Sequence, residues 1–180
     1  LSANVGLFEF DETTLAQSRV IVAGNRRIGV TAVLGPTYQK RVNNGSVKMI
    51  DPVAALTRVV PLLQQKADFL VLLAHATREE SIELGRKFPQ FALVVTAGGP
   101  AEPPAQAEEI VKGGVQLIEV GEKGMYAVVV GLFDDPRQPL RYQRVPLDSR
   151  FTASRDMRAL MAAYQDQLRT LGLAGLGIRA

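Results

Sequence analysis

The chain has 180 residues, of which 47% are hydrophobic and 22% are charged, so it is long enough to bury the core of one soluble globular domain. It contains no cysteine, which excludes disulfides, thiolate zinc sites and cysteine nucleophiles. Its formal net charge is +3, but the 21 Lys and Arg residues are scattered along the chain, so we expect no nucleic-acid partner.

No apolar stretch of the sequence approaches the ~18 residues that a membrane-spanning helix needs, so we expect no membrane span. No signal-peptide pattern is present at the start of the chain. Because the chain begins with Leu1 instead of Met, we expect that a leader was removed or that the chain is a piece of a longer protein.

The first part of the chain favours β-structure. We expect a short strand within residues 1–10. Residues 19–23 and 28–34 are β-rich runs on either side of a polar turn that contains Gly24, which predicts a hairpin. The composition of residues 37–46 is typical of a loop.

Two helix–strand units follow. Asp51 can cap a helix that has Pro52 at its first position, and Thr77 with Glu80 three residues later matches a capping box. The predicted elements, in order, are a helix over 52–63, a strand over 69–74, a helix over 78–88 and a strand over 91–95. This alternation predicts an α/β layer with parallel strands.

The second half of the sequence changes character. Residues 116–120 and 125–133 read as strands joined by a glycine turn, and residues 140–145 extend them into a β meander. Residues 154–171 predict a final helix, which glycines at 172, 175 and 177 follow as an exit linker. One face of that helix is apolar and is expected to dock on this domain or on a neighbour: Met157, Leu160, Met161, Tyr164, Leu168 and Leu171.

Most signatures of catalysis are absent from the sequence. It has neither a Gly-x-x-x-x-Gly-Lys-Ser/Thr phosphate loop nor a Gly-x-Ser-x-Gly nucleophile turn. His75, the only histidine, stands where a buried strand ends, and in α/β domains ligand sites gather beyond the carboxyl ends of the strands. Two interpretations stay open: His75 is a half-buried residue that bonds a nearby carbonyl, or it contacts a metal or an anion.

The order of these elements resembles the second half of the metallophosphoesterase domain of the 5′-nucleotidase (UshA-like, calcineurin-like) family. Residues 1–5 are similar to the strand that follows that family's Gly-Asn-His-Glu motif. Asp51-Pro52-Val53, together with the run 67–75 that ends in His75, resembles its helix, strand and metal-binding histidine. Residues 121–133 are similar to its closing strands, and 148–168 to the helix that leads out of the domain.

Two departures from the family's pattern bear on function. The family's other metal ligands come from the first half of its domain, and its Gly-His-x-His turn corresponds here to Gly98-Gly99-Pro100-Ala101-Glu102. If Gly99 matches the family's glycine, Pro100 and Glu102 replace the histidines. The resemblance therefore implies at most two metal ligands, His75 and Glu102, whereas two-metal hydrolysis needs several fixed ligands for each ion.

We therefore expect an α/β fold that forms part of a metallophosphoesterase-type layered sandwich, with a parallel α/β layer followed by a β meander and a C-terminal helix. Residues 1–150 would be the C-terminal half of the phosphoesterase-like domain, and residues 151–180 the exit helix and linker. No catalytic residue and no cofactor is expected for this chain alone. A divalent Mn, Zn or Fe ion would bind only if the phosphoesterase site is retained.

The resemblance implies a non-catalytic module with a degenerate site in a larger periplasmic or extracellular protein. Such modules also occur beside multihaem cytochrome domains. Its partner would be the missing N-terminal half or an adjacent domain, and the oligomeric state stays open. Two alternatives are a metal-dependent phosphoesterase whose other ligands lie in an absent N-terminal half, and an interaction scaffold that docks a partner through its C-terminal helix.

Overall fold

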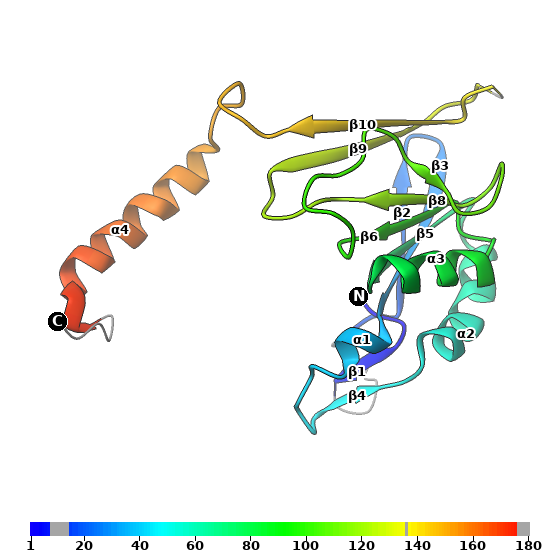
Figure 1. Ribbon diagram of the computed structural model, residues 1–180, viewed down its shortest axis with the longest axis horizontal. Helices are drawn as coiled ribbons and strands as arrows, with labels where there is room; N and C mark the ends of the chain where they lie inside the picture. Colours follow the sequence, from blue (N-terminus) through cyan, green and yellow to red (C-terminus); the bar gives the residue numbers. More distant parts are fainter. Residues whose placement is uncertain (8–14, 136, 176–180) are drawn as a thin grey trace. The chain divides into compact units, whose positions relative to one another are not determined.

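A six-stranded mixed sheet forms the centre of the unit that comprises residues 1–146 (Figure 1). The computed structural model describes residues 1–7, 15–135 and 137–175, with side chains described as far as residue 171. In spatial order the strands are β2 (Ser18–Ala23), β3 (Arg26–Leu34), β5 (Phe69–His75), β6 (Leu93–Thr96), β8 (Gln116–Glu119) and β7 (Glu108–Glu109). The inner four strands are mutually parallel, while β2 and β7 run antiparallel at the edges. The predicted hairpin and α/β layer are confirmed.

The two helices of this layer begin at the capping residues that the sequence predicts. The Asp51 carboxylate accepts a hydrogen bond from the Ala54 N–H (2.9 Å) at the start of α2 (Pro52–Gln64). At the start of α3 (Arg78–Lys87), Thr77 and Glu80 form both hydrogen bonds of a capping box. These caps satisfy backbone N–H groups that have no partner within the first helical turn.

One face of the sheet packs on the helices and forms the core. In-register residues of the four parallel strands are almost completely buried there: Thr31, Leu72, Val94 and Leu117. Leu56 and Leu63 of α2 belong to the same buried set. Because burial of apolar surface contributes about 25 cal/mol of stability per Å², this face is the main source of the stability of the unit.

The opposite face of the sheet is apolar but less well covered, and we call it the open face. Because side chains alternate along a strand, the residues between the core positions point to this side. Most of them are half-buried or exposed: Ile28, Val30, Ala32 and Leu34 of β3, Phe69, Val71, Leu73 and His75 of β5, and Val95 of β6. Leu93 of β6 and Ile118 of β8 lie on the same side and are buried.

Two elements depart from the sequence-based expectation near the start of the chain. The region expected to be a loop contains a short helix, α1 (Pro36–Gln39), because Pro36 fixes a helical φ at its first position. Strand β4 (Val47–Met49) was not predicted, and it pairs antiparallel with β1 (Val5–Leu7). Strand β1 confirms part of the strand expected within residues 1–10, whose last residues, 8–10, lie outside the described chain.

The strands of the second half are divided between two sheets. Strand β8 joins the six-stranded sheet, whereas β9 (Tyr126–Leu132) and β10 (Leu140–Pro146) form a separate antiparallel hairpin. Between β8 and β9, the backbone takes a left-handed φ at Gly121 (72°), Lys123 (57°) and Gly124 (63°), which redirects the chain out of the first sheet. The expected run of three strands is thus present, but only its last two strands pair with each other.

The second unit, residues 147–180, contains the predicted final helix, α4 (Arg155–Gly175). Gly172 and Gly175, expected in an exit linker, are still helical, and Gly177 lies outside the described residues. Among the described residues, no helix combines the length and the apolar character that crossing a membrane requires. The α/β class, the layered arrangement and the C-terminal helix are confirmed.

Candidate functional site

His75 is the last residue of β5, at the carboxyl end of the strand, and its side chain is exposed. Its ring lies against the ring of Tyr38 from α1, with centroids 4.5 Å apart and planes inclined at 44°. The Arg41 guanidinium lies over the same tyrosine ring, 4.9 Å from its centroid. The His75 carbonyl accepts a hydrogen bond from the Gly35 N–H (2.8 Å), which ties the strand end to the start of α1. The interpretation of His75 as a half-buried residue is therefore wrong.

Glu102 lies in the connection between β6 and β7, and its carboxylate pairs with an arginine from the hairpin. Its Oε1 is 2.6 Å from Nη1 of Arg144 in β10. The same Nη1 donates to the Pro103 carbonyl (2.5 Å), and the Tyr142 hydroxyl donates to the Pro104 carbonyl (2.9 Å). Glu102 thus takes part in attaching this loop to β10.

Within the described part of the chain, the residues present do not by themselves form a set that fits a metal centre. His75 contacts Tyr38 and Glu102 pairs with Arg144, so the two predicted ligands have different partners. In the described ranges 1–7, 15–135 and 137–175, no three His, Cys, Asp or Glu side chains come close enough together to hold one ion. A catalytic metal needs three or more protein ligands fixed in geometry, and those present here supply no such set.

The Gly98-Gly99 turn after β6 is required by close packing as well as by chain reversal. A Cβ on Gly98 would lie 2.0 Å from the Ala76 carbonyl oxygen, and a Cβ on Gly99 would lie 2.2 Å from Glu119 Oε1. Both distances are far below van der Waals contact, so the backbone of this turn rests directly on the ends of β5 and β8.

A buried polar cluster that the sequence reading missed fixes this end of the sheet. The Thr96 hydroxyl donates to the Ala76 carbonyl (3.2 Å), accepts from the Gly98 N–H (3.1 Å) and lies 3.0 Å from the Ser81 hydroxyl. Beside it, Glu119 is only 4% exposed, and its Oε1 lies 3.2 Å from Nε of Arg78. One feature of the sequence could have indicated this cluster: Thr96 and Glu119 are each the polar last residue of an apolar strand.

Asp68 precedes β5 at the other end of the sheet and pairs with Arg27. Its carboxylate accepts from Arg27 Nη2 (2.7 Å), Nε (3.1 Å) and the backbone N–H (3.2 Å). These hydrogen bonds favour the ionised form and lower the pKa of Asp68 from 3.8 to about 2. This pairing attaches the start of β5 to β3.

Three hollows border the open face. The hollow beside His75, about 450 Å³, is mainly apolar and is lined by Ala32, Leu73 and Val95 among others. Two more lie between the sheet and the hairpin: one of about 580 Å³ has Ile28 on the sheet side and Val130 on the hairpin side, and the other is about 1020 Å³.

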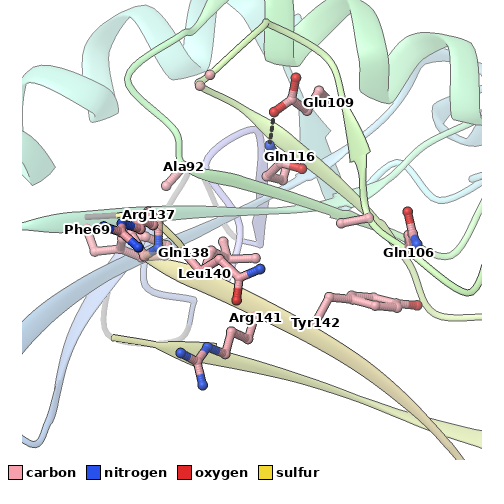
Figure 2. Close-up of a pocket in the computed structure, with 14 residues that line it drawn as sticks. Phe69, Ala92, Gln106, Glu109, Gln116, Arg137, Gln138, Leu140, Arg141 and Tyr142 are labelled. Atoms are coloured by element: carbon pink, nitrogen blue, oxygen red, sulfur yellow. Dashed lines mark hydrogen bonds between the residues drawn. The ribbon is translucent and has the colours of Figure 1, made fainter. Parts of the chain in front are cut away.

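Figure 2 shows the largest of these hollows. Phe69 and Gln116 come from strands of the sheet, while Leu140 and Tyr142 come from β10. Together, the hollows show that the hairpin covers the open face only in part. This face therefore has room for further packing.

Comparison with known proteins shows which solved structures share this fold. No protein-family model matches the chain, and no curated protein sequence matches it. A 5′-nucleotidase precursor from Thermus thermophilus is similar in structure, with a TM-score of 0.72 and 19% identity over 95% of this chain. The sulfate thiohydrolase SoxB from the same species gives a TM-score of 0.72 and 16% identity over 93% of this chain.

A putative 5′-nucleotidase from Staphylococcus aureus, solved with alpha-ketoglutarate, gives a TM-score of 0.64 and 18% identity over 92% of this chain. The chain therefore has the fold found in part of these 5′-nucleotidase structures, and the resemblance expected from the sequence is confirmed at the level of the fold. It spans only 38%, 32% and 36% of the three solved chains, respectively.

Proposed function

We propose that the chain is the C-terminal half of a 5′-nucleotidase-type phosphoesterase domain, and that it acts as a structural or interaction module without hydrolytic activity of its own. The observation that carries this proposal is the state of the two candidate ligands. The His75 ring is exposed against Tyr38, and the Glu102 carboxylate is paired with Arg144. A glutamate held in that ion pair would have to give up a charged partner before it could bind a metal.

The open face supports the view that this chain is one layer of a larger domain. Its apolar side chains border hollows of about 450, 580 and 1020 Å³, and an uncovered apolar surface of this kind marks an interaction site. The chain also spans about a third of each solved 5′-nucleotidase-type chain that it resembles. We infer that another layer of the same protein covers the open face.

We also propose a periplasmic or extracellular location for the whole protein. One of the similar solved structures is described as a 5′-nucleotidase precursor, which supports an exported setting. If the module stands beside a multihaem cytochrome region, that region must lie outside this chain. The reason is that haem attachment through Cys-x-x-Cys-His needs cysteines, and this sequence has none.

An assay of the full-length protein tests the absence of hydrolysis. With Mn²⁺ or Zn²⁺ and p-nitrophenyl phosphate, we expect the same turnover from the wild type and from the His75→Ala variant. Glu102→Gln extends the test to the second candidate ligand, because it removes the carboxylate charge while keeping the shape of the side chain. Metal-dependent hydrolysis that His75→Ala abolishes would instead establish the alternative, a phosphoesterase that draws its remaining ligands from another segment.

A further inference from the structure

The hairpin β9–β10 leaves one edge of β9 without a partner, and its hydrogen bonds show which groups are free. The Phe133 N–H donates to the Pro139 carbonyl (2.9 Å), so these two residues form a hydrogen-bonded pair. In an antiparallel ladder such pairs alternate with non-bonded ones. Ala127, Val129 and Gly131 therefore direct their backbone groups toward β10.

The alternate residues of β9, namely Tyr126, Val128, Val130 and Leu132, direct their N–H and C=O groups to the outer edge. No strand in the described part of the chain pairs with that edge. Its sequence, Tyr-Ala-Val-Val-Val-Gly-Leu, contains no charge and no proline. Natural proteins protect a free edge with charged residues, proline or a bulge, so an unprotected apolar edge is a template for another strand.

The outer edge of β10 is less suited to pairing. Pro146 has no N–H to offer, and the side chains of Tyr142 and Arg144 hold the loop at Pro103 and Pro104. Of the two edges of the hairpin, the edge of β9 is therefore the one open to a strand.

We propose that β9 is the docking edge of this module, and that it pairs with an extended apolar strand from the layer that covers the open face. This inference rests on the proposed function, in which that layer belongs to the same protein. The number of strands in the two sheets supports the proposed pairing. The hairpin β9–β10 has two strands, whereas the sheet that it partly covers has six, so the hairpin is too narrow to cover that sheet.

The side chains beside the edge indicate the kind of strand that fits. Val130 and Leu132 line a hollow that also contains Ile28 and the charged residues Arg26, Asp68 and Asp134, so an incoming strand meets apolar side chains next to β9 and polar groups beyond them. On the other side of β9, Val129 is 51% exposed, and a cross-strand apolar neighbour would cover it. A strand that is apolar on both sides is typical of the interior of a layered sandwich.

Residue-resolved amide hydrogen exchange in the full-length protein tests the pairing. We expect the amides of Val128, Val130 and Leu132 to exchange as slowly as those of Val129 and Gly131, because both sets are hydrogen-bonded. Rapid exchange of the first set beside slow exchange of the second would contradict the pairing. Protection that disappears on dilution would also contradict it, because the strand would then come from a second copy of the chain.

Two matched proline variants sharpen the test. Val130→Pro removes an N–H from the outer edge of β9, whereas Leu140→Pro removes one from the outer edge of β10. Neither N–H bonds the other strand of the hairpin. In the full-length protein we expect Val130→Pro, but not Leu140→Pro, to abolish protection of the neighbouring Val128 and Leu132 amides. Equal effects of the two variants would overturn the proposal.

The exposure of Leu73 on the open face, measured in the same protein, separates the two proposals. If Leu73 is covered while the outer amides of β9 exchange rapidly, the covering layer exists but does not pair with β9. If Leu73 is accessible and the same amides exchange rapidly, both the pairing and the proposed function fail.

Discussion

At the residue scale, the close packing of Gly98 and Gly99 at the carboxyl ends of β5 and β8 could not be predicted from the sequence. In the sequence, Gly98-Gly99 only corresponds in position to the family's Gly-His-x-His turn. The structure shows that each glycine is also needed because another part of the chain, Ala76 or Glu119, occupies the space of its missing side chain. Such contacts join residues that are distant in sequence, and a local pattern carries no information about them.

The Arg27–Asp68 pair gives a prediction about acid stability. The pKa of Asp68 is lowered in the folded protein to about 2, from 3.8, mainly through its hydrogen bonds with Arg27. A carboxyl group with a lowered folded-state pKa contributes stability that is fully present above its unfolded pKa and is lost as the pH falls through its folded pKa. The contribution should therefore disappear between about pH 4 and pH 2.

Urea unfolding of the wild type and of Asp68→Asn between pH 5 and pH 2 checks this prediction. We expect the wild type to be the more stable protein at pH 5 and the two proteins to converge toward pH 2. In an Arg27→Ala background, Asp68→Asn should leave the pH dependence almost unchanged. If the difference between wild type and variant is constant across this range, the pair makes no ionisation-linked contribution.

At the element scale, helices α2 and α3 were predictable because capping residues and apolar spacing both act within a few residues of the chain. Strand β4 was not, because it has only three residues and its position depends on a buried side chain that precedes β1 in the sequence. Asn4 is 0% exposed, and its Nδ2 donates to the carbonyls of Leu34 (2.9 Å) and Ile50 (3.1 Å). Its Oδ1 accepts from the Leu34 N–H (2.9 Å).

We expect Asn4→Ala to destabilise the fold by about 1–3 kcal/mol, because buried backbone groups at the ends of β3 and β4 would lose their partners. Asn44→Ala is the matched control: Asn44 is exposed and its side chain accepts a hydrogen bond from the nearby Ser46 N–H (2.9 Å), so its loss should stay within about 0.5 kcal/mol. Chemical denaturation of both variants measures the difference. Similar losses would show that Asn4 does not connect these elements.

At the scale of the whole molecule, the α/β layer was predictable because the alternation of helices and strands restricts the topology. The division of the last three strands between two sheets was not. It depends on the left-handed backbone at Gly121, Lys123 and Gly124, which a glycine-rich turn permits but does not specify. The candidate site was predictable only in part. The position of His75 at a strand end followed from its sequence context, whereas the pairing of Glu102 with Arg144 joins residues 42 positions apart.

Cysteine accessibility on the two faces of the sheet layer tests the central claim, that another layer of the same protein covers the open face. Leu73 lies on the open face and is 40% exposed in this chain, whereas Leu62 of α2 is 56% exposed on the helix side. The chain has no cysteine, so each position can carry the only thiol of this segment. In the full-length protein, we predict that Leu73→Cys resists alkylation while Leu62→Cys reacts readily. Rapid alkylation at both positions would contradict the account.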